Sequence, residues 1–267
     1  MPYFLLNRAL NRAPCLFLLF ILCVTSPGLQ AENCLTPRYD ETVTVKRIVD
    51  GDTLQLLDGR KLRLIGINTP ELNTRTKAAE PLAHSARQHL LTLARPGRPL
   101  KLRWGTEKKD RYGRLLAHGF NSEGRNLSAA LLAAGMGAAI QIPPNLWAYD
   151  CYLRTENNAR KNLFGIWSHA YFNPLNAHQL ATDVNGFHFV RGRLSRVGES
   201  KSALWLNLGE HFALRIPKSD LAYFNNIPFK QLIGRPLTAR GWVYSYQGQK
   251  RINLHHPGSL EIGHKHE

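Results

Sequence analysis

The sequence predicts a β-rich α+β protein in which a five-stranded barrel with three helices precedes a second, small β-barrel. Three observations lead to this prediction. Apolar residues alternate between Asp-Gly turns in residues 43–67, three later runs show helical spacing, and short strand-like runs punctuated by glycine fill residues 187–254. A period of two indicates half-buried strands, whereas spacings of three and four indicate helices.

Residues 43–67 predict a three-strand meander that starts the first barrel. Val43, Val45, Leu54 and Leu56 alternate with polar residues, and the third strand follows at residues 62–67. The Asp-Gly pairs at 50–51 and 58–59 supply tight hairpin turns. Pro70 ends the meander because proline cannot donate to a strand ladder.

Helical and strand-like runs then alternate up to residue 165. Helical spacing covers residues 82–93 and ends before a Pro-Gly pair, and strands are expected at 100–104 and 114–120. Asn126 is a good N-cap for a helix at 127–134, and a third helix at 149–164 is stopped by Gly165. This order fits a small five-stranded barrel with helices on its outside.

The region after a linker at residues 182–186 reads as an all-β unit. Only residues 220–225 look helical, and the most economical arrangement is a second barrel of the oligonucleotide-binding type. At least half of its aromatic residues should be core, because alternation places every second side chain inside. Those residues are Phe187, Phe189, Trp205, Trp242 and Tyr244, and the predicted strands are 187–197, 203–208, 212–216, 236–246 and 249–254.

Residues 1–31 resemble a secretory signal peptide. Arg8 and Arg12 precede an apolar run at 15–24, and Ala31 follows helix breakers at a plausible cleavage point. A membrane anchor is the alternative, but the run is shorter than the ~20 residues that a spanning helix needs. We therefore expect an exported protein, periplasmic or extracellular, with one domain at 32–181, a second at 182–267, and no stable membrane association after cleavage.

The chain is strongly basic, with a net charge of +16. Residues 32–181 hold 21 Lys and Arg against 13 Asp and Glu, and residues 182–267 hold 12 against 6. Both halves are therefore basic, as expected for a protein that binds a polyanion, although general solubility would explain the charge equally well.

Two of the four cysteines, Cys34 and Cys151, lie outside the predicted signal peptide. Because paired cysteines are common in exported proteins, we predict a Cys34–Cys151 disulfide that ties the N-terminal arm to the third helix. Two free thiols are the alternative, since sequence spacing does not place their Cα atoms.

A cluster of acids and arginines suggests phosphodiester chemistry. Asp52 lies in a turn, Glu71 follows a strand and a proline, and Asn68 and the Thr69 carbonyl add neutral oxygen ligands. All-oxygen ligands suit Ca²⁺ or Mg²⁺ rather than zinc. Arg63 and Arg114 can each donate two hydrogen bonds to phosphate. Taken singly, the acids are better explained as turn residues and the arginines as surface ion pairs, but together they indicate a site.

The ordered motifs resemble those of staphylococcal nuclease (thermonuclease) homologues over about residues 43–167. The matching segments are Asp50-Gly51-Asp52-Thr53, Arg63 followed by Asn68-Thr69-Pro70-Glu71, Asp110-Arg111-Tyr112-Gly113-Arg114, and Gly165-Ile166-Trp167. Any one of these motifs alone is weak.

The resemblance implies a role for each matching residue. Asp52 would bind the metal with Asn68 and the Thr69 carbonyl, Glu71 would be the general base, and Arg63 and Arg114 would contact the phosphate. Tyr112 and Arg111 would lie near the substrate. The family cleaves DNA and RNA with Ca²⁺ and leaves 3′-phosphates.

The chain departs from the family at Asn68, where members commonly carry a second aspartate. Asparagine keeps one oxygen ligand but removes a charge, so metal affinity should fall. The sequence thus predicts a secreted, monomeric, Ca²⁺-dependent endonuclease acting on DNA and RNA without sequence specificity. A nucleic-acid-binding module with weak or lost catalysis is the alternative, and a surface protein that binds a sulfated or phosphorylated glycan is a third.

Overall fold

The computed structural model describes residues 1, 3, 34–73 and 78–264. The described residues from 34 onward belong to one compact unit, Ala31–Glu267. The predicted signal peptide lies outside the described residues except for Met1 and Tyr3, and the predicted division of the remainder at residue 182 stays a prediction. No helix among the described residues is both long and apolar enough to cross a membrane.

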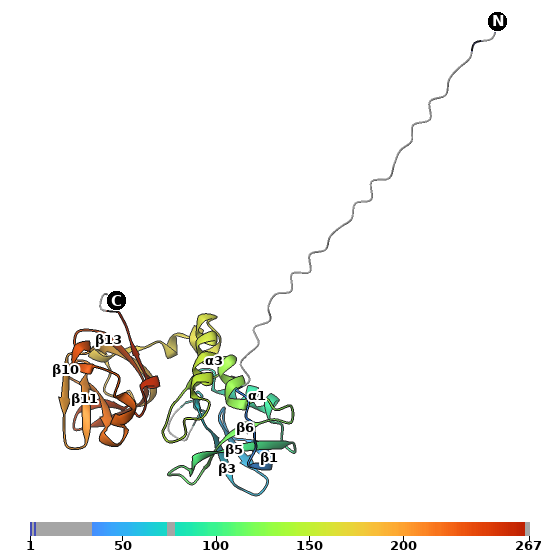
Figure 1. Cartoon of the computed structure of the whole chain (residues 1–267), viewed down its shortest axis with the longest axis horizontal. Helices are drawn as coiled ribbons and strands as arrows, with labels where there is room; N and C mark the ends of the chain where they lie inside the picture. The colour runs from blue at the N-terminus through green and yellow to red at the C-terminus, as the bar shows by residue number, and fades with distance from the viewer. Residues whose placement is uncertain (2, 4–33, 74–77, 265–267) are drawn as a thin grey trace. The chain divides into compact units, whose positions relative to one another are not determined.

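Five strands close the predicted N-terminal barrel in the order β1-β2-β3-β6-β5 (Figure 1). The meander is confirmed: β1 pairs antiparallel with β2, and β2 with β3. β3 and β6 pair in parallel, with Arg63 opposite Leu116, and this pairing was not predicted. The strands are β1 Glu41–Ile48, β2 Thr53–Leu56, β3 Lys61–Leu64, β5 Pro99–Lys109 and β6 Leu115–Phe120, and a short pair, β4 Ile67–Asn68 and β7 Ala138–Ala139, lies outside the barrel.

Three α-helices accompany this barrel, as predicted: α1 Ala83–Leu93, α2 Leu127–Ala133 and α3 Tyr149–Lys161. Asn126 caps α2, since its side chain accepts a hydrogen bond from the Ala129 N–H. The third helix is shorter than predicted. It ends at Lys161, and Leu163 and Gly165 both take positive φ before the 3₁₀ turn η1, Gly165–Ser168.

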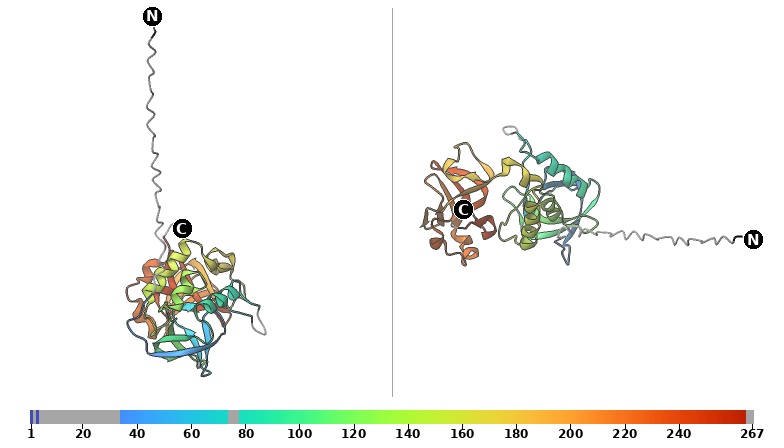
Figure 2. Two further views of the ribbon diagram at one scale, coloured as in Figure 1. Left: turned by 90° about the vertical axis from the view of Figure 1, so that its right-hand side faces the viewer. Right: turned by 90° about the horizontal axis from the view of Figure 1, so that it is seen from above.

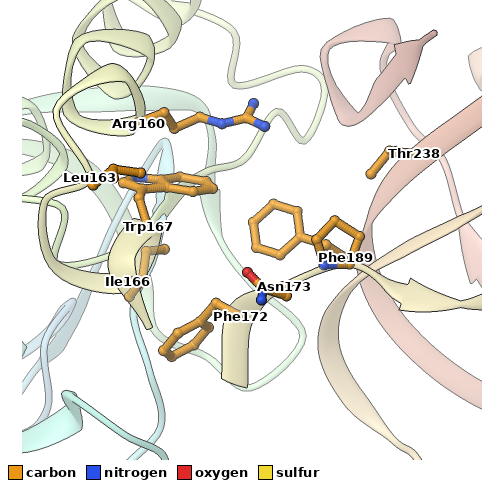
Figure 3. A pocket seen from close by; sticks show the side chains of 9 residues that line it. Arg160, Leu163, Ile166, Trp167, Phe172, Asn173, Phe189 and Thr238 are labelled. Atoms are coloured by element: carbon orange, nitrogen blue, oxygen red, sulfur yellow. The ribbon is translucent and has the colours of Figure 1, made fainter. Parts of the chain in front are cut away.

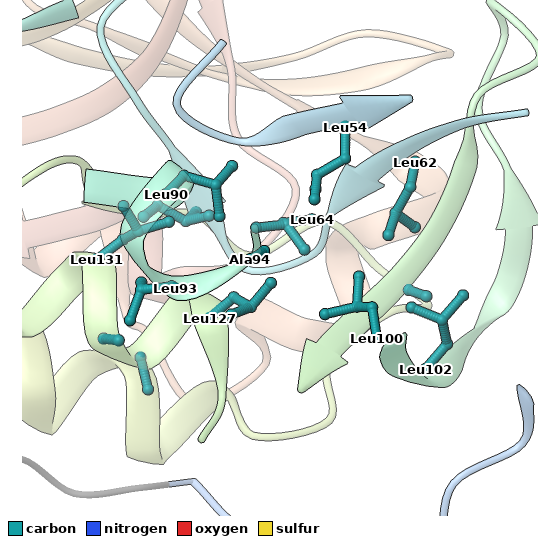
Figure 4. Close-up of a cluster of buried hydrophobic side chains, with 14 of the residues drawn as sticks. Leu54, Leu62, Leu64, Leu90, Leu93, Ala94, Leu100, Leu102, Leu127 and Leu131 are labelled. Carbon is teal, nitrogen blue, oxygen red and sulfur yellow. The ribbon is translucent and has the colours of Figure 1, made fainter. Parts of the chain in front are cut away.

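Leucines from the strands and helices fill the interior of the barrel (Figure 4). Leu54, Leu62 and Leu100 come from strands and are fully buried, and Leu90 and Leu131 reach them from α1 and α2. Burial of each such side chain contributes about 1.5–3 kcal/mol. The core therefore fixes the ends of β1, β2 and β3, where the predicted site residues lie.

The predicted disulfide between Cys34 and Cys151 is confirmed, with Cα atoms 5.8 Å apart and a sequence separation of 117 residues. Cys34 is buried against the barrel core, and its carbonyl accepts a hydrogen bond from the Asn126 side chain. The bridge thus ties the N-terminal arm to α3, close to the start of α2.

The remaining strands gather in a second sheet (Figure 2). It runs in the order β10-β11-β12-β14-β13-β9-β8, and β15 also pairs with β13. β9 and β10 are almost continuous along the chain, since only Leu194 and Ser195 separate them. This nearly continuous segment pairs with β13 through β9 and with β11 through β10, so the strands from β9 to β14 form a ring. The strands are β8 Leu175–Asn176, β9 Gly186–Arg193, β10 Arg196–Glu199, β11 Ala203–Asn207, β12 Phe212–Pro217, β13 Pro236–Tyr246, β14 Gln249–Asn253 and β15 Leu260–Ile262.

This ring repeats the strand plan of the first barrel. β12 and β14 pair in parallel, as β3 and β6 do, and the other neighbours in the ring are antiparallel. The helical expectation near residue 220 is confirmed, because residues 218–224 form a 3₁₀ segment. The expectation that at least half of the five aromatic residues are core was wrong, because only Phe189 is buried and Trp242 is 43% exposed. The 3₁₀ segments are η2 Ala170–Phe172, η3 Ala177–Gln179, η4 Lys218–Phe224, η5 Phe229–Leu232 and η6 Pro257–Ser259.

A buried ion pair joins α3 to the second sheet. Arg240 on β13 places Nη1 2.6 Å from Oε2 of Glu156 on α3, and the two side chains are 4% and 0% exposed. Glu156 also accepts from the Ala139 N–H at 2.8 Å. Burial opposes charge on Arg240, but the carboxylates of Glu156 and Glu261 prevail and raise its pKa.

Candidate functional site

Asp52 is the centre of the candidate site and lies buried in the turn between β1 and β2. Its Oδ2 accepts from the Thr69 N–H at 2.9 Å and from the Thr69 hydroxyl at 3.1 Å. Among the described residues, its Oδ1 accepts only from the neighbouring Thr53 hydroxyl, at 3.1 Å. The turn approaches the Thr69 loop closely, because a Cβ on Gly51 would lie 2.5 Å from the Thr69 hydroxyl oxygen. Glycine is required there for steric reasons.

Arg63 on β3 lies directly against Asp52, with Nη1 3.0 Å from Oδ2. The same nitrogen donates to the carbonyls of Leu64 and Ile67, and Nη2 donates to Oδ1 of Asn68 at 3.1 Å. The side chain is therefore held rigidly by four contacts. The sequence predicted that Arg63 belongs to the site but not that it organises the loop containing Asn68.

Asn68 and Thr69 are both buried beside Asp52. β4 holds Asn68 opposite Ala138 of β7. The Asn68 amide oxygen faces the Arg63 guanidinium, so an uncharged acceptor occupies a place where a carboxylate would form a second ion pair with Arg63.

Glu71 follows this loop and is exposed, but its backbone is anchored by Glu80, which sequence reasoning did not identify. The Glu71 N–H donates to Glu80 Oε2 at 3.0 Å, and the Glu80 N–H donates back to the Glu71 carbonyl at 2.9 Å. Although the Glu71 side chain reaches the surface, partial desolvation by the protein atoms around it and the Asp52 carboxylate raise its pKa, while Arg63 and Arg114 oppose that rise. No sequence signal identified Glu80, since it lies nine residues further along the chain.

Asp50 is a second acid that the site prediction omitted, although the motif contains it. Its Oδ1 accepts from the Asp52 N–H at 3.0 Å. Burial and the nearby Asp52 carboxylate raise the pKa of Asp50 to about 7. Asp50, Asp52 and Glu71 thus repel one another, and Arg63 is the cation that opposes this repulsion most directly.

Arg114 approaches Glu71 from the turn before β6. Its Nε donates to Asp110 Oδ2 at 2.7 Å, and its charge lowers the pKa of Glu71. Among the described residues, neither terminal nitrogen of Arg114 has a hydrogen-bond partner, so both can reach a substrate. Tyr112 is 69% exposed and lies beneath the guanidinium groups of Arg111 and Arg114, 4.8 and 5.6 Å from its ring centre. The structure therefore brings Asp52, Arg63, Asn68 and Thr69 into direct contact. The charges of Asp52, Arg63 and Arg114 also act on Glu71.

Comparison with known proteins identifies the family. The family model "Staphylococcal nuclease homologue" matches residues 61–169. The thermonuclease of Staphylococcus intermedius is 30% identical over 134 residues, which is 48% of this chain and 76% of the relative. The chain belongs to the staphylococcal nuclease homologue family.

Two Bacillus subtilis relatives have similar identity over the same length of this chain. Endonuclease YncB is 29% identical over 131 residues, 47% of this chain and 61% of the relative. Endonuclease YhcR is 30% identical over 135 residues, 46% of this chain and 11% of the relative. The chain therefore spans less than two thirds of these two endonucleases. The family model's match ends at residue 169, before the second sheet.

The donor atoms of this family member fit a hard divalent cation. A cation would relieve the repulsion that the Asp52 carboxylate exerts on Asp50 and Glu71, and oxygen is the ligand that Ca²⁺ prefers. The Asp52 Oδ1, the Asn68 amide oxygen and the Thr69 carbonyl are the ligands available for it. Among the described residues, no three His, Cys, Asp or Glu side chains gather closely enough to hold a metal without other ligands. Carbonyl and water oxygens would therefore complete the coordination.

A separate cavity lies away from these acids (Figure 3). Arg160 and Trp167 line one side, and Phe189 and Thr238 line the other. Its lining includes Ile166 and Trp167 of the family motif but none of the acids or arginines of the candidate site.

Proposed function

We propose that the protein is an exported, monomeric, Ca²⁺-dependent endonuclease that hydrolyses DNA and RNA without sequence specificity and leaves 3′-phosphate ends. The observation that supports this most directly is the contact between Asp52 and Arg63, with Glu71 and Arg114 beside it. The basic charge of the chain favours a polyanionic substrate, and the disulfide is typical of exported proteins.

In this proposal Asp52, Asn68 and the Thr69 carbonyl would hold Ca²⁺, which would supply positive charge for the phosphate. Glu71 accepts the proton of the attacking water, and its raised pKa makes it a stronger base than an ordinary glutamate. Arg63 and Arg114 donate to the phosphate oxygens as negative charge develops there. The bond between phosphorus and the 5′ oxygen then breaks, and the leaving 5′ oxygen takes a proton from water. Arg63 acts from a fixed position, whereas Arg114 uses its two terminal nitrogens, which have no hydrogen-bond partner among the described residues.

Plasmid cleavage with Ca²⁺ and with a chelator tests this proposal. We expect cleavage when Ca²⁺ is present and none when the chelator is present. End-group analysis of the products should find 3′-phosphates. E71Q should lower turnover by about 10²–10⁴-fold, as the loss of a general base does. E123Q, a change at an exposed glutamate of the same barrel, serves as the control and should leave turnover unchanged. Normal turnover in E71Q would remove Glu71 from the mechanism.

A nucleic-acid-binding module with lost catalysis is the second candidate, and Asn68 is the observation that favours it. The missing carboxylate weakens the cation site, and the amide oxygen already accepts from Arg63. Wild-type protein that retards plasmid migration but leaves the DNA uncut at every Ca²⁺ concentration would establish this alternative.

A further inference from the structure

The second sheet carries an aromatic and cationic surface that the nuclease site does not use. Trp205 on β11, Arg215 on β12, Arg251 on β14 and Tyr246 on β13 form it, and we call it the Trp205 face. β11 and β13 are labelled in Figure 1. All four residues lie beyond the part of the chain that matches the nuclease family.

Strand register places these side chains on the outside of the sheet. Trp205 pairs opposite Arg215, and their neighbours Leu206 and Leu214 are fully buried in the core. Arg251 is likewise next to the buried Ile252. Because successive side chains point to opposite faces of a strand, Trp205, Arg215 and Arg251 point away from the core.

The arginines hold the aromatic rings in a continuous arrangement. The Arg251 guanidinium lies 4.7 Å from the Trp205 ring centre and 4.6 Å from that of Tyr246. Arg215 lies 5.9 Å from the Trp205 ring on the neighbouring strand. The indole N–H donates to the Ser200 hydroxyl at 3.1 Å, which orients the ring. Tyr246 is 52% exposed, so part of this arrangement is open to solvent.

The positive charge of this face is not neutralised. Within the described part of the chain, neither Arg215 nor Arg251 forms an ion pair with a carboxylate. Glu199 at the end of β10 is paired instead with Lys218. Residues 182–267 as a whole carry 12 Lys and Arg against 6 Asp and Glu. A negatively charged ligand is therefore favoured here.

Flat rings beside unpaired guanidinium groups match one kind of polyanion. Bases of a single strand can stack on aromatic side chains while arginines contact the phosphates. A duplex hides its base faces, and a sulfated glycan has no aromatic ring to stack. We propose that the Trp205 face binds single-stranded nucleic acid, with bases stacking on Trp205 and Tyr246 and phosphates contacting Arg215 and Arg251. This inference rests on the proposed function, because the Trp205 face would hold a second stretch of the nucleic-acid strand that the nuclease site cleaves.

Fluorescence anisotropy of the whole protein with labelled oligothymidylate, in chelator so that no cleavage occurs, tests the inference. An oligonucleotide of about twenty nucleotides exceeds the ~4–16 nucleotides that such barrels cover. W205A should weaken binding about tenfold, as expected when one stacked base is lost. W205F should keep near-normal affinity, since it retains a flat ring. W242A is the matched control, because Trp242 is exposed on the same sheet without an arginine over its ring within the described residues.

The arginines are tested by the salt dependence of the same binding. R215Q/R251Q should lower the slope of log affinity against log salt by about 1.4, because each phosphate contact on a single strand contributes about 0.7. R215K/R251K should keep most of that slope, since it keeps both charges. An unchanged slope in the glutamine variant would contradict the phosphate contacts.

Three outcomes would overturn the inference. In the first, W205A and W242A bind the oligonucleotide with equal affinity. In the second, duplex DNA binds as tightly as the oligonucleotide and its binding is weakened equally by W205A. In the third, heparin binds as tightly as the oligonucleotide and its binding is weakened equally by W205A. Failure of the nuclease proposal is distinguishable from these results. E71Q should lose cleavage but keep oligothymidylate binding. If the wild-type protein cuts no DNA and W205A still weakens oligothymidylate binding, the nuclease proposal is wrong and the binding inference holds.

Discussion

The backbone N–H of Glu71 donates to the Glu80 carboxylate at 3.0 Å, and the Glu80 N–H donates back to the Glu71 carbonyl at 2.9 Å. The two residues are joined across a loop whose residues 74–77 lie outside the described structure. Tyr171 adds a hydroxyl 3.4 Å from the other oxygen of Glu80. Glu80 is therefore a positioning residue for the proposed base.

Removing the Glu80 acceptor should lower turnover more than substrate affinity. E80A frees the Glu71 backbone, and a misplacement of about 1 Å at a catalytic group can cost about 10²-fold in rate. E80Q keeps an amide oxygen for the Glu71 N–H and should restore most of kcat. Steady-state kinetics on one DNA substrate, with the exposed E123A as control, separates kcat from KM. Equal losses in E80A and E80Q would mean that the charge of Glu80, not its position, matters.

Replacing Asn68 by aspartate should strengthen Ca²⁺ binding. An added carboxylate charge near a divalent ion is worth about 1–2 kcal/mol when screened by water, which corresponds to about tenfold in affinity. The Ca²⁺ concentration that gives half-maximal cleavage should fall by that factor in N68D. N225D adds the same charge at an exposed residue of the second sheet region and should leave the Ca²⁺ requirement unchanged. A higher Ca²⁺ requirement in N68D would show that the new carboxylate is neutralised by Arg63 instead.

Breaking the ion pair between Arg240 and Glu156 should destabilise the protein strongly. R240A leaves a fully buried carboxylate without its partner, which typically costs about 3–5 kcal/mol. The double variant E156A/R240A should lose less than the sum of the two single changes, since it leaves no unpaired charge. Urea unfolding measures all three. Additive losses would mean that the pair is not coupled.

The half-exposed pair between Arg160 and Glu261 provides the comparison for that experiment. Its side chains are 33% and 41% exposed, and Arg240 would remain beside Glu261 after R160A. Water screens such pairs, so their contribution is about 0–1 kcal/mol. R160A should therefore lower the free energy of unfolding much less than R240A does.

His118 should make the protein less stable in acid. Burial lowers the pKa of His118 from 6.5 to about 3, with a smaller contribution from Arg103, and its Nδ1 lies 2.8 Å from the Tyr152 hydroxyl. Between these two pH values the unfolded chain binds a proton that the folded protein does not, so stability falls by up to about 1.4 kcal/mol per pH unit as pH decreases. H118Q should flatten this dependence in urea unfolding between pH 6.5 and 4. H84Q, which changes an exposed histidine, should retain the wild-type slope.

The elements that the sequence predicted are those fixed by neighbouring residues. The meander, the three helices and the Asn126 cap follow from alternation, helical spacing and one side-chain oxygen. The parallel pairing of Arg63 with Leu116 and the ion pair between Glu156 and Arg240 join residues far apart in the sequence, where no local pattern exists. Such contacts depend on the whole fold.

The same distinction explains the site prediction. Motif spacing placed Asp52, Arg63 and Glu71 together because the three lie near adjacent strand ends. Glu80 was missed because it acts through backbone hydrogen bonds across a loop. The aromatic residues of the second sheet were expected mainly in the core, but Trp205 lies on the outer face because its strand register, not its apolar character, decides its side.

The disulfide between Cys34 and Cys151 closes a covalent ring that includes every residue of the candidate nuclease site, from Asp50 to Arg114. A protease that cuts the backbone once inside this ring would leave the two pieces attached to each other. The nicked protein would migrate as one chain in electrophoresis until a reductant was added. The second sheet lies outside the ring, so one cut between residues 151 and 175 would break the covalent link between that sheet and the residues of the ring.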